Sequence, residues 1–394
     1  MPTPAPCRVG LMIETSNAYS RGLIRGVMGY ARQRGGWSLW LAESERGHAP
    51  SALRHWDGDG LIARVENPQV AAAITATGKP VVDVSSARLL PAAPWVETDD
   101  AAIAQAAFEH LCGLGLTHFG YAGDERFNWS RWRQQHLVQV AAAAGFDCSV
   151  CPAVDRERWA RQRDATAAWL AGLPRPVGVL ACYDLRAREV LDACQVAGLR
   201  VPDDVAVLGV DNDELLCDLA DPPLSSVAPN AARAGAEAAA LLDRVLTGAP
   251  VPPAAHLIPP VGVIHRQSTD ILAVDDPDVA AAVRFIRANA PRGIGVADVL
   301  RAVPVSRRVL EARFSKVLGH TPHEEIVRVQ LGRAKELLVQ TDLPLAAIAD
   351  RVGFAHAGHL SVVFKKATGQ SPGEYRRHSI PTHGPGRPDQ WAVK

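Results

Sequence analysis

The stretch that decides the fold runs from Leu360 to Arg376 and reads LSVVFKKATGQSPGEYR. Its apolar residues recur at intervals of three and four: Leu360, Val363, Phe364 and Ala367. This spacing places them on one face of a helix. Gly369 is positioned to end that helix in a left-handed cap, and Pro372 follows where the helix cannot continue. The stretch therefore predicts a short amphipathic helix with a sharply defined end.

The same spacing occurs once more, earlier in the chain. The pattern Leu310-x3-Phe314-x4-Gly319-x-Thr321-Pro322 matches the later one position for position. A short apolar helix pattern and a tight turn precede each copy, at Val296–Val303 and at Leu345–Val352, and a longer helix pattern over Glu324–Val339 joins the two. This arrangement predicts two helix-turn-helix units connected by a helical spacer.

These residues resemble the DNA-binding region of the AraC/XylS family of transcription regulators. The resemblance covers Val279–His378 and includes GFxxxxxLxxxFKKxxGxSPxxYR at Gly353–Arg376. It implies that the second helix of each unit enters a major groove of DNA.

The candidate DNA-binding residues lie opposite the apolar face of each second helix: Arg307, Arg308, Glu311 and Ser315 in the first unit, and His356, His359, Ser361 and Lys365 in the second. An arginine can read guanine through paired hydrogen bonds, and a glutamate can accept one from cytosine. We expect Lys365 to contact phosphate instead, which positions the helix without reading sequence.

Charge is distributed unevenly along a chain whose formal net charge is zero. Residues 279–378 contain 16 Lys and Arg against 8 Asp and Glu, a net charge of +8, whereas residues 1–278 contain 24 against 33, a net charge of −9. A basic region attached to an acidic one is typical of a protein that binds a polyanion through one module. Charge alone leaves open the alternative of a basic surface that is merely solvated.

Several other classes of protein find no support. Cys148-x-x-Cys151 lacks a second pair at metal-ligand spacing, so we expect reduced thiols rather than a redox or metal site. The chain has no HExxH, GxSxG, Walker or complete GxGxxG motif, so we expect neither an enzyme nor a bound cofactor. It also has no cationic start followed by an apolar run, and no run of about 18 apolar residues, so we expect a cytoplasmic protein without a membrane span.

Residues 1–266 show apolar strand patterns that alternate with helical ones, which is typical of parallel sheets covered by helices on both faces. The patterns form two series and therefore predict two lobes. We expect the chain to cross between the lobes near residues 96–100 and 225–229. Open α/β sheets bind ligands beyond the carboxyl ends of their strands, so the candidate ligand site lies there.

Polar side chains follow the ends of several predicted strands. Asp211 comes directly after the apolar run Val205–Val210, and Asp184 has the corresponding place after an earlier strand. Asn17 and Tyr19 lie in the first strand-to-helix loop. Carboxylate and amide groups in such places suit a sugar, whose hydroxyls both donate and accept hydrogen bonds.

A second resemblance covers about residues 7–266. The segments Val207–Asn212, reading VLGVDN, and Leu224–Val227, reading LSSV, are similar to signatures of LacI-type regulators and periplasmic sugar-binding proteins. The resemblance implies a sugar-binding domain in which Arg133 matches the ligand-binding arginine and Asn212 belongs to the same signature as Asp211.

The order of the two regions, effector domain first and AraC-type region last, resembles the family of xylose operon regulators. We expect an α/β two-lobed periplasmic-binding-protein-like domain at residues 1–266, a linker at 267–278, an all-α domain with two helix-turn-helix motifs at 279–378, and a disordered tail at 379–394. Asp278 is placed to cap the first helix of the all-α domain.

We therefore expect a sugar-responsive transcription regulator that activates pentose catabolic genes. The resemblance implies D-xylose as the effector, DNA and RNA polymerase as partners, and a homodimer. One alternative is a repressor or regulator of the same build that responds to another sugar or polyol. A sugar-binding transport protein is the alternative from a different class, and the basic C-terminal region argues against it.

Overall fold

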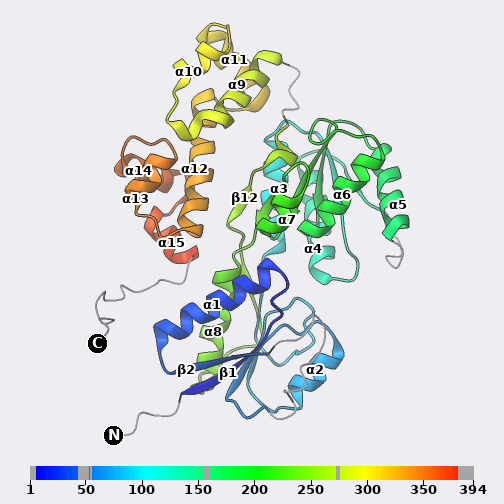
Figure 1. The fold of residues 1–394 in the computed structure, drawn as a ribbon, viewed down its shortest axis with the longest axis vertical. Helices are drawn as coiled ribbons and strands as arrows, with labels where there is room; N and C mark the ends of the chain where they lie inside the picture. Colours follow the sequence, from blue (N-terminus) through cyan, green and yellow to red (C-terminus); the bar gives the residue numbers. More distant parts are fainter. Residues whose placement is uncertain (1–5, 43–52, 54–55, 154–158, 272–275, 380–394) are drawn as a thin grey trace, which may run out of the picture. The chain divides into compact units, whose positions relative to one another are not determined.

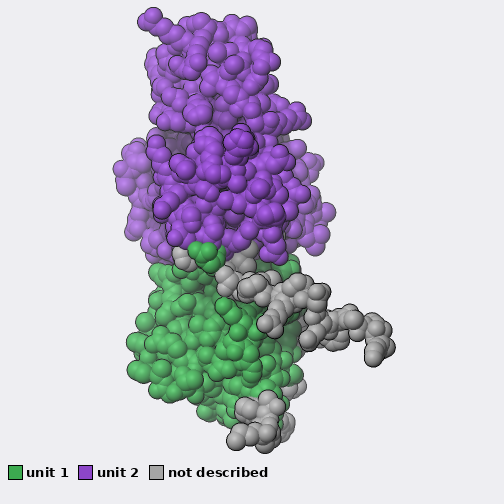
Figure 2. All heavy atoms as spheres, turned by 90° about the vertical axis from the view of Figure 1, so that its left-hand side faces the viewer, with its two compact units in different colours: residues 1–98, 230–258, 377–394 green, residues 99–229, 259–376 purple. Residues whose placement is uncertain are grey.

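The computed structural model describes residues 6–42, 53, 56–153, 159–271 and 276–379, and Figure 1 shows its elements. The chain divides into two compact units, coloured separately in Figure 2: unit 1 takes residues 1–98, 230–258 and 377–394, and unit 2 takes residues 99–229 and 259–376. Within the α/β part the chain crosses between the units after residues 98, 229 and 258. The sequence predicted the first two crossings and missed the third.

Unit 1 is built on a six-stranded sheet in the order β11-β5-β4-β3-β1-β2, with its neighbouring strands parallel. Its strands are β1 (Cys7–Met12), β2 (Trp37–Leu41), β3 (Gly60–Ala63), β4 (Val81–Asp83), β5 (Trp95–Thr98) and β11 (Ala255–Ile258). Its helices are α1 (Ala18–Arg34), α2 (Pro68–Thr75) and α8 (Ala231–Leu246). The third crossing was missed because β11 is short and only Ile258 in it is buried, so it shows no apolar alternation.

Unit 2 contains a second six-stranded sheet, in the order β12-β10-β9-β8-β6-β7. Its strands are β6 (His118–Ala122), β7 (Cys148–Val150), β8 (Val177–Ala181), β9 (Val205–Val210), β10 (Ser225–Ala228) and β12 (Gly262–Ile264). Its helical elements are α3 (Asp100–Cys112), α4 (Asn128–Ala143), α5 (Trp159–Ala171), α6 (Asp184–Val196), α7 (Glu214–Leu219) and the 3-10 helix η2 (Gln267–Thr269). Strand β12 is antiparallel to β10, whereas the other neighbouring pairs are parallel.

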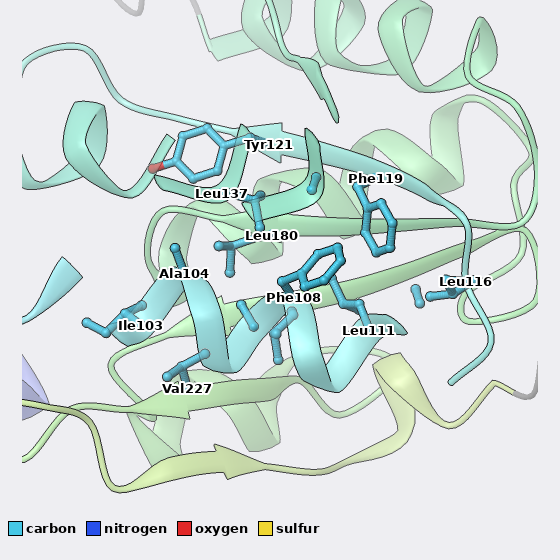
Figure 3. Packing of buried hydrophobic residues seen from close by; sticks show 14 of the residues in the cluster. Ile103, Ala104, Phe108, Leu111, Leu116, Phe119, Tyr121, Leu137, Leu180 and Val227 are labelled. Atoms are coloured by element: carbon cyan, nitrogen blue, oxygen red, sulfur yellow. The ribbon is translucent and has the colours of Figure 1, made fainter. Parts of the chain in front are cut away.

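Helix α3 is bound to this sheet by apolar packing along its length. Ile103, Phe108 and Leu111 belong to one buried cluster with Phe119 of β6 and Leu180 of β8. Figure 3 shows Phe108 pointing toward Phe119, and their ring centroids are 5.0 Å apart. Because protein interiors are close-packed, a helix held in this way resists bending.

The helical region of unit 2 follows. Its elements are α9 (Pro277–Asn289), the 3-10 helix η3 (Ala290–Arg292), α10 (Val296–Ala302), α11 (Arg307–Leu318), α12 (Pro322–Gln340), α13 (Leu345–Arg351), α14 (Ala357–Thr368) and α15 (Pro372–Ser379). Helices α10–α11 and α13–α14 form the two predicted helix-turn-helix units, so the predicted fold class is confirmed. Of the tail predicted at 379–394, Ser379 is the last residue of α15, and the rest lies outside the described residues.

Most of the predicted helix ends in this region are confirmed, and two details are corrected. Gly319 and Gly369 end α11 and α14 in left-handed caps, with φ of 75° and 76°. Asp276, rather than Asp278, caps α9, because its side chain accepts hydrogen bonds from the first backbone N–H groups of the helix. In α14, Leu360 and Phe364 are fully buried and Val363 is half-buried, but Ala367, predicted on the same face, is exposed.

The two helix-turn-helix units are joined through backbone contacts as well as through the spacer helix α12. Gln330 of α12 is buried and donates from Nε2 to Ala290 O at 3.0 Å and to Gly353 O at 3.2 Å. A Cβ on Gly353, whose φ is 84°, would lie 2.4 Å from Gly293 N. Only glycine permits both this φ and this close approach, so the two units are locked to one another at this point.

Candidate functional site

The first polar cluster lies at the carboxyl ends of β8 and β9 in unit 2, and we call it the unit 2 cluster: Arg133, Asp184, Asp211 and Asn212. Asp211 and Asn212 follow β9 directly and have φ of 109° and 48°. A non-glycine residue with a positive φ costs about 1–3 kcal/mol, and such strain is concentrated at functional sites. Here two such residues follow one another. Hydrogen bonds from both backbone N–H groups hold this conformation: Asp211 N donates to Val227 O at 3.0 Å, and Asn212 N donates to Ser226 Oγ at 3.0 Å.

Arg133 enters the same cluster from α4. Its guanidinium is buried, donating from Nε to Asp100 Oδ1 at 2.7 Å and from Nη1 to Cys182 O at 2.6 Å. Burial disfavours the charged form, but Asp100 and Asp211 raise the pKa of Arg133 above its ordinary value. The guanidinium lies 4.7 Å from the centre of the Trp129 ring. The structure therefore places both Asp100 and Asp211 within electrostatic reach of Arg133.

Asp184 lies beneath the loop that carries Asp211. It is the first residue of α6 rather than a loop residue, and only 1% of its surface is exposed. It accepts hydrogen bonds from Ser226 Oγ at 2.6 Å and from Asp213 N at 2.7 Å. Burial and the neighbouring Asp211 raise the pKa of Asp184 well above its ordinary value. A Cβ on Gly209 would lie 2.2 Å from Asp184 Oδ1, so glycine at that position makes room for this carboxyl group.

Aromatic side chains lie beside Arg133. Trp129 stacks on Phe127 with ring centroids 4.9 Å apart and meets Tyr183 edge-on at 5.7 Å. Trp129 is half-buried. Flat apolar rings next to charged hydrogen-bonding groups provide both kinds of contact that a sugar ring requires.

The second polar cluster lies at the carboxyl ends of β1 and β3 in unit 1, and we call it the unit 1 cluster: Glu14, Asn17, Tyr19, Ser20 and Arg64. Asn17 caps α1 by accepting from Ser20 N at 2.8 Å, and its Nδ2 donates to Glu14 Oε1 at 2.9 Å. Arg64 Nη1 donates to the same Glu14 oxygen at 2.6 Å. The Arg64 guanidinium lies 5.7 Å from the centre of the Tyr19 ring.

Sequence reasoning found Asn17 and Tyr19 but missed Glu14 and Arg64. A signal was present, because both residues follow buried strands, at the same kind of position that singled out Asp211. Glu14 is 6% exposed, and a buried carboxylate requires a paired cation of the kind that Arg64 supplies.

The candidate DNA-binding residues lie where the sequence placed them, on the surfaces of α11 and α14. In α11, Arg307, Arg308 and Ser315 are exposed, and Glu311 is half-buried. Arg307 Nε donates to Glu311 Oε1 at 2.8 Å, an ion pair one helical turn apart. This pair leaves Arg308 as the exposed cation beside it.

In α14 the corresponding surface is less charged. His356, His359 and Lys365 are exposed, and Ser361 is half-buried. Val362 lies on the same surface with 69% of its area exposed, which is unusual for a valine. An exposed methyl-bearing side chain suits contact with the methyl group of thymine.

No helix of the described residues is long and apolar enough to span a bilayer. Within the same ranges, no group of three or more His, Cys, Asp and Glu side chains is arranged to hold a metal ion. Among the described residues, none of the seven cysteines forms a disulfide, and four of them are buried.

Comparison with known proteins assigns the parts of the chain. Family models match residues 8–101 as an XylR N-terminal domain, residues 108–269 as a periplasmic binding protein-like domain, and residues 299–378 as a helix-turn-helix domain. These matches follow the order that the sequence predicted.

Similarity to individual proteins extends over almost the whole chain. The xylose operon regulatory proteins of Escherichia coli (strain K12) and Haemophilus influenzae are 34% and 30% identical over 379 residues, which is 94% of this chain and 96% and 98% of theirs. A solved xylose-binding transcription activator xylR is 34% identical, with a TM-score of 0.61 over 94% of this chain and 97% of that one. The chain therefore belongs to the family of xylose operon regulatory proteins, which are transcription regulators with a helix-turn-helix region.

Proposed function

We propose that this chain is a cytoplasmic, D-xylose-responsive activator of transcription, which binds DNA as a homodimer and acts on RNA polymerase. The similarity to xylose operon regulatory proteins over 94% of the chain carries this proposal. It is supported by polar clusters at the carboxyl ends of strands in both α/β sheets and by exposed charged residues on α11 and α14.

The sugar is held by hydrogen bonds to charged groups. Asp211 accepts from sugar hydroxyls, and its strained backbone fixes the direction of its carboxylate. Arg133 donates to a ring or hydroxyl oxygen, and Asn212 provides an amide beside it. Asn17 and Tyr19 of unit 1 are ligand-binding candidates in their own cluster, beside Glu14 and Arg64. Asp184 contributes by holding the loop of Asp211 in place.

DNA is bound through the two helix-turn-helix units. Arg308 and the Arg307–Glu311 pair read base edges from α11. His356, His359 and Ser361 form the corresponding surface of α14, where Lys365 contacts phosphate.

A titration of the purified full-length chain with D-xylose, L-arabinose, D-ribose and D-glucose tests the proposal. We expect D-xylose to bind with the highest affinity. Asp211→Ala should weaken its binding by about 10–150-fold, because losing hydrogen bonds to a buried charged group costs about 1.5–3 kcal/mol.

The matched control is Asp203→Ala, since the Asp203 carboxylate is 61% exposed and pairs with Arg200, outside the unit 2 cluster. It should bind D-xylose like the wild type. Equal D-xylose affinity in Asp211→Ala and wild type would remove Asp211 from the site, and no binding of any of the four sugars would overturn the sugar-responsive function.

A further inference from the structure

Helix α3 begins in the unit 2 cluster. Its first residue, Asp100, is 6% exposed and accepts the hydrogen bond from Arg133 Nε. Its 13 residues span about 20 Å at about 1.5 Å per residue. Because its apolar side chains are packed into the core along this length, a displacement of Asp100 is carried to the other end of the helix.

The other end of α3 contacts the segment that leads to the helical region. His110 Nε2 lies 3.0 Å from Thr269 Oγ1, and the His110 ring lies 5.6 Å from the ring of His265. Thr269 is fully buried, and its hydroxyl also donates to Ser225 Oγ at 2.7 Å. The hydroxyl of Thr269 therefore makes a polar contact between α3 and η2, directly before Asp270.

The residues that follow Thr269 are bound to α9. Arg287 Nη1 donates to Ile271 O at 3.2 Å and lies 3.4 Å from Asp270 Oδ1. Arg287 Nε lies 3.8 Å from Glu325 Oε1 of α12. A single guanidinium thus connects the last described residues of the α/β part to the spacer helix.

Glu325 carries the connection to the first recognition helix. It is 1% exposed and accepts from His320 Nε2 at 2.9 Å and from Arg328 Nε at 2.7 Å. His320 comes directly after Gly319, the cap of α11, and its ring meets Phe314 of α11 edge-on at 5.7 Å. The contacts that start at Arg133 therefore end at the helix that carries Arg308.

We propose that these contacts transmit occupancy of the sugar site to α11. We give the name α3 path to three contacts: the hydrogen bonds His110–Thr269 and Arg287–Ile271 and the ion pair Arg287–Glu325. A sugar oxygen that accepts a hydrogen bond from Arg133 changes the hydrogen bond between Arg133 and Asp100 and so displaces Asp100. Helix α3 transmits this displacement to Thr269, and the remaining contacts of the path transmit it to α11. The inference rests on the proposed function, since it requires that a sugar binds beside Arg133.

The test uses two buried threonines of unit 2. Thr269→Val removes the hydroxyl in the α3 path while nearly keeping the volume. Thr166→Val is the matched control, because Thr166 is equally buried and its hydroxyl donates to Gln162 O and accepts from Arg186, away from the path. Arg287→Lys is a second path variant, which keeps the charge but loses the fork that reaches several oxygens at once.

Full-length proteins are titrated with a DNA duplex that the wild-type chain selects from a random library, with and without saturating D-xylose. The ratio of the two dissociation constants is the coupling factor, typically about 5–150 in regulated proteins. We expect Thr269→Val and Arg287→Lys to keep less than about a third of the wild-type factor. Their affinity for D-xylose alone should change less than about twofold, and Thr166→Val should retain the full factor.

Hydrogen exchange gives a second readout that loss of stability alone would not mimic. In the wild type, D-xylose should change amide protection in α3 and at residues 318–321, whereas in Thr269→Val it should change protection in α3 only. A wild-type coupling factor in both path variants, or an equal loss in Thr166→Val, would overturn the inference while leaving the proposed function intact. A wild-type chain that binds no D-xylose would instead overturn the proposed function together with this inference.

Discussion

The two helix-turn-helix units share a backbone frame but differ in the residue that anchors it. After the glycine cap of α11 and of α14, Thr321 and Ser371 come directly before the next helix. The backbone N–H of each donates a hydrogen bond of 2.7 Å to a side-chain oxygen three residues later, of Glu324 and Glu374 respectively. One residue further on, the first unit has Glu325 and the second has Tyr375 at the matching position.

These two anchors make chemically different contacts. Glu325 accepts hydrogen bonds from His320 and Arg328, and although burial opposes its ionisation, these donors hold its pKa at about 2. Tyr375 meets the Phe364 ring edge-on at 5.2 Å and donates from its hydroxyl to Val261 O at 3.0 Å. The anchor of the first helix-turn-helix unit is thus held by charged groups, and that of the second by an aromatic ring and one neutral hydrogen bond. Substitutions at the two anchors should therefore have different effects on stability.

The largest difference should come from removing the charged anchor. Glu325→Gln removes the carboxylate that Arg287, Arg328 and His320 share, and breaking a buried ion pair costs about 3 kcal/mol or more. Urea unfolding of the full-length protein, with amide exchange of α11 and α14 as local probes, should show loss of protection in α11 first. Glu336→Gln is the control on the same helix, since the partner of Glu336, Arg333, is half exposed. A loss below about 1 kcal/mol in Glu325→Gln would remove the distinction between the anchors.

A somewhat smaller effect should separate the reading surfaces. Arg308→Ala should weaken the preferred DNA site by about 1–3 kcal/mol and relax the choice of base at one position, because a paired arginine–guanine contact is lost. Lys365→Ala should weaken binding to all sequences alike and reduce the salt dependence. Selecting DNA sites with each variant checks this division. If both variants lost affinity for the same DNA sequences to the same extent, the first helix-turn-helix unit would contribute no more to sequence recognition than the second.

The neutral anchor should be worth less than the charged one. Tyr375→Phe removes one hydrogen bond to Val261 O and keeps the ring on Phe364, so we expect a loss of about 1 kcal/mol in the free energy of unfolding. Amide exchange of α14 should report it, while α11 stays unchanged. A loss as large as that of Glu325→Gln would mean that the hydroxyl, rather than the ring, holds the second unit.

The smallest effect should be a pH dependence confined to the first unit. His320 has two acceptors, Leu318 O at 2.8 Å from Nδ1 and Glu325 Oε2 at 2.9 Å from Nε2, so both ring nitrogens must donate. The bond to Glu325 raises the pKa of His320 above its ordinary value of 6.5. The stabilisation is therefore present below pH 6.5 and is lost as the pH rises through the raised pKa.

The matching residue of the second unit, Gln370, does not titrate, so His320→Gln is the natural comparison. The difference in thermal midpoint between wild type and His320→Gln should shrink as the pH rises from about 6 to 9. We expect it to correspond to about 0.5 kcal/mol, since the imidazole is partly exposed. A difference that stays constant over this range would show that His320 does not titrate between these pH values.

The features that could be predicted from the sequence are those that depend on residues close together in the chain. The repeated units, their glycine caps and the two sheets follow from periodicity within short segments. The third crossing could not be predicted, because β11 is a four-residue strand defined by its pairing with β5, which lies far away in the chain. The positions of Glu14 and Arg64 after strands are a local signal, but their pairing is not, since nothing in their neighbouring residues shows that β1 and β3 lie side by side.

The contact between Gly293, Gly353 and Gln330 has a consequence for the DNA that the protein can use. Because it locks the two helix-turn-helix units together, α11 and α14 cannot adjust their separation independently to suit a given site. On the proposed mode of DNA binding, the two groups of bases that α11 and α14 contact must then keep a fixed phase along the double helix. Inserting about five base pairs between those groups turns one of them to the opposite side, whereas inserting about ten restores the side but increases the distance by a full turn. The helical phase of an operator is thus fixed by a backbone contact that touches no base.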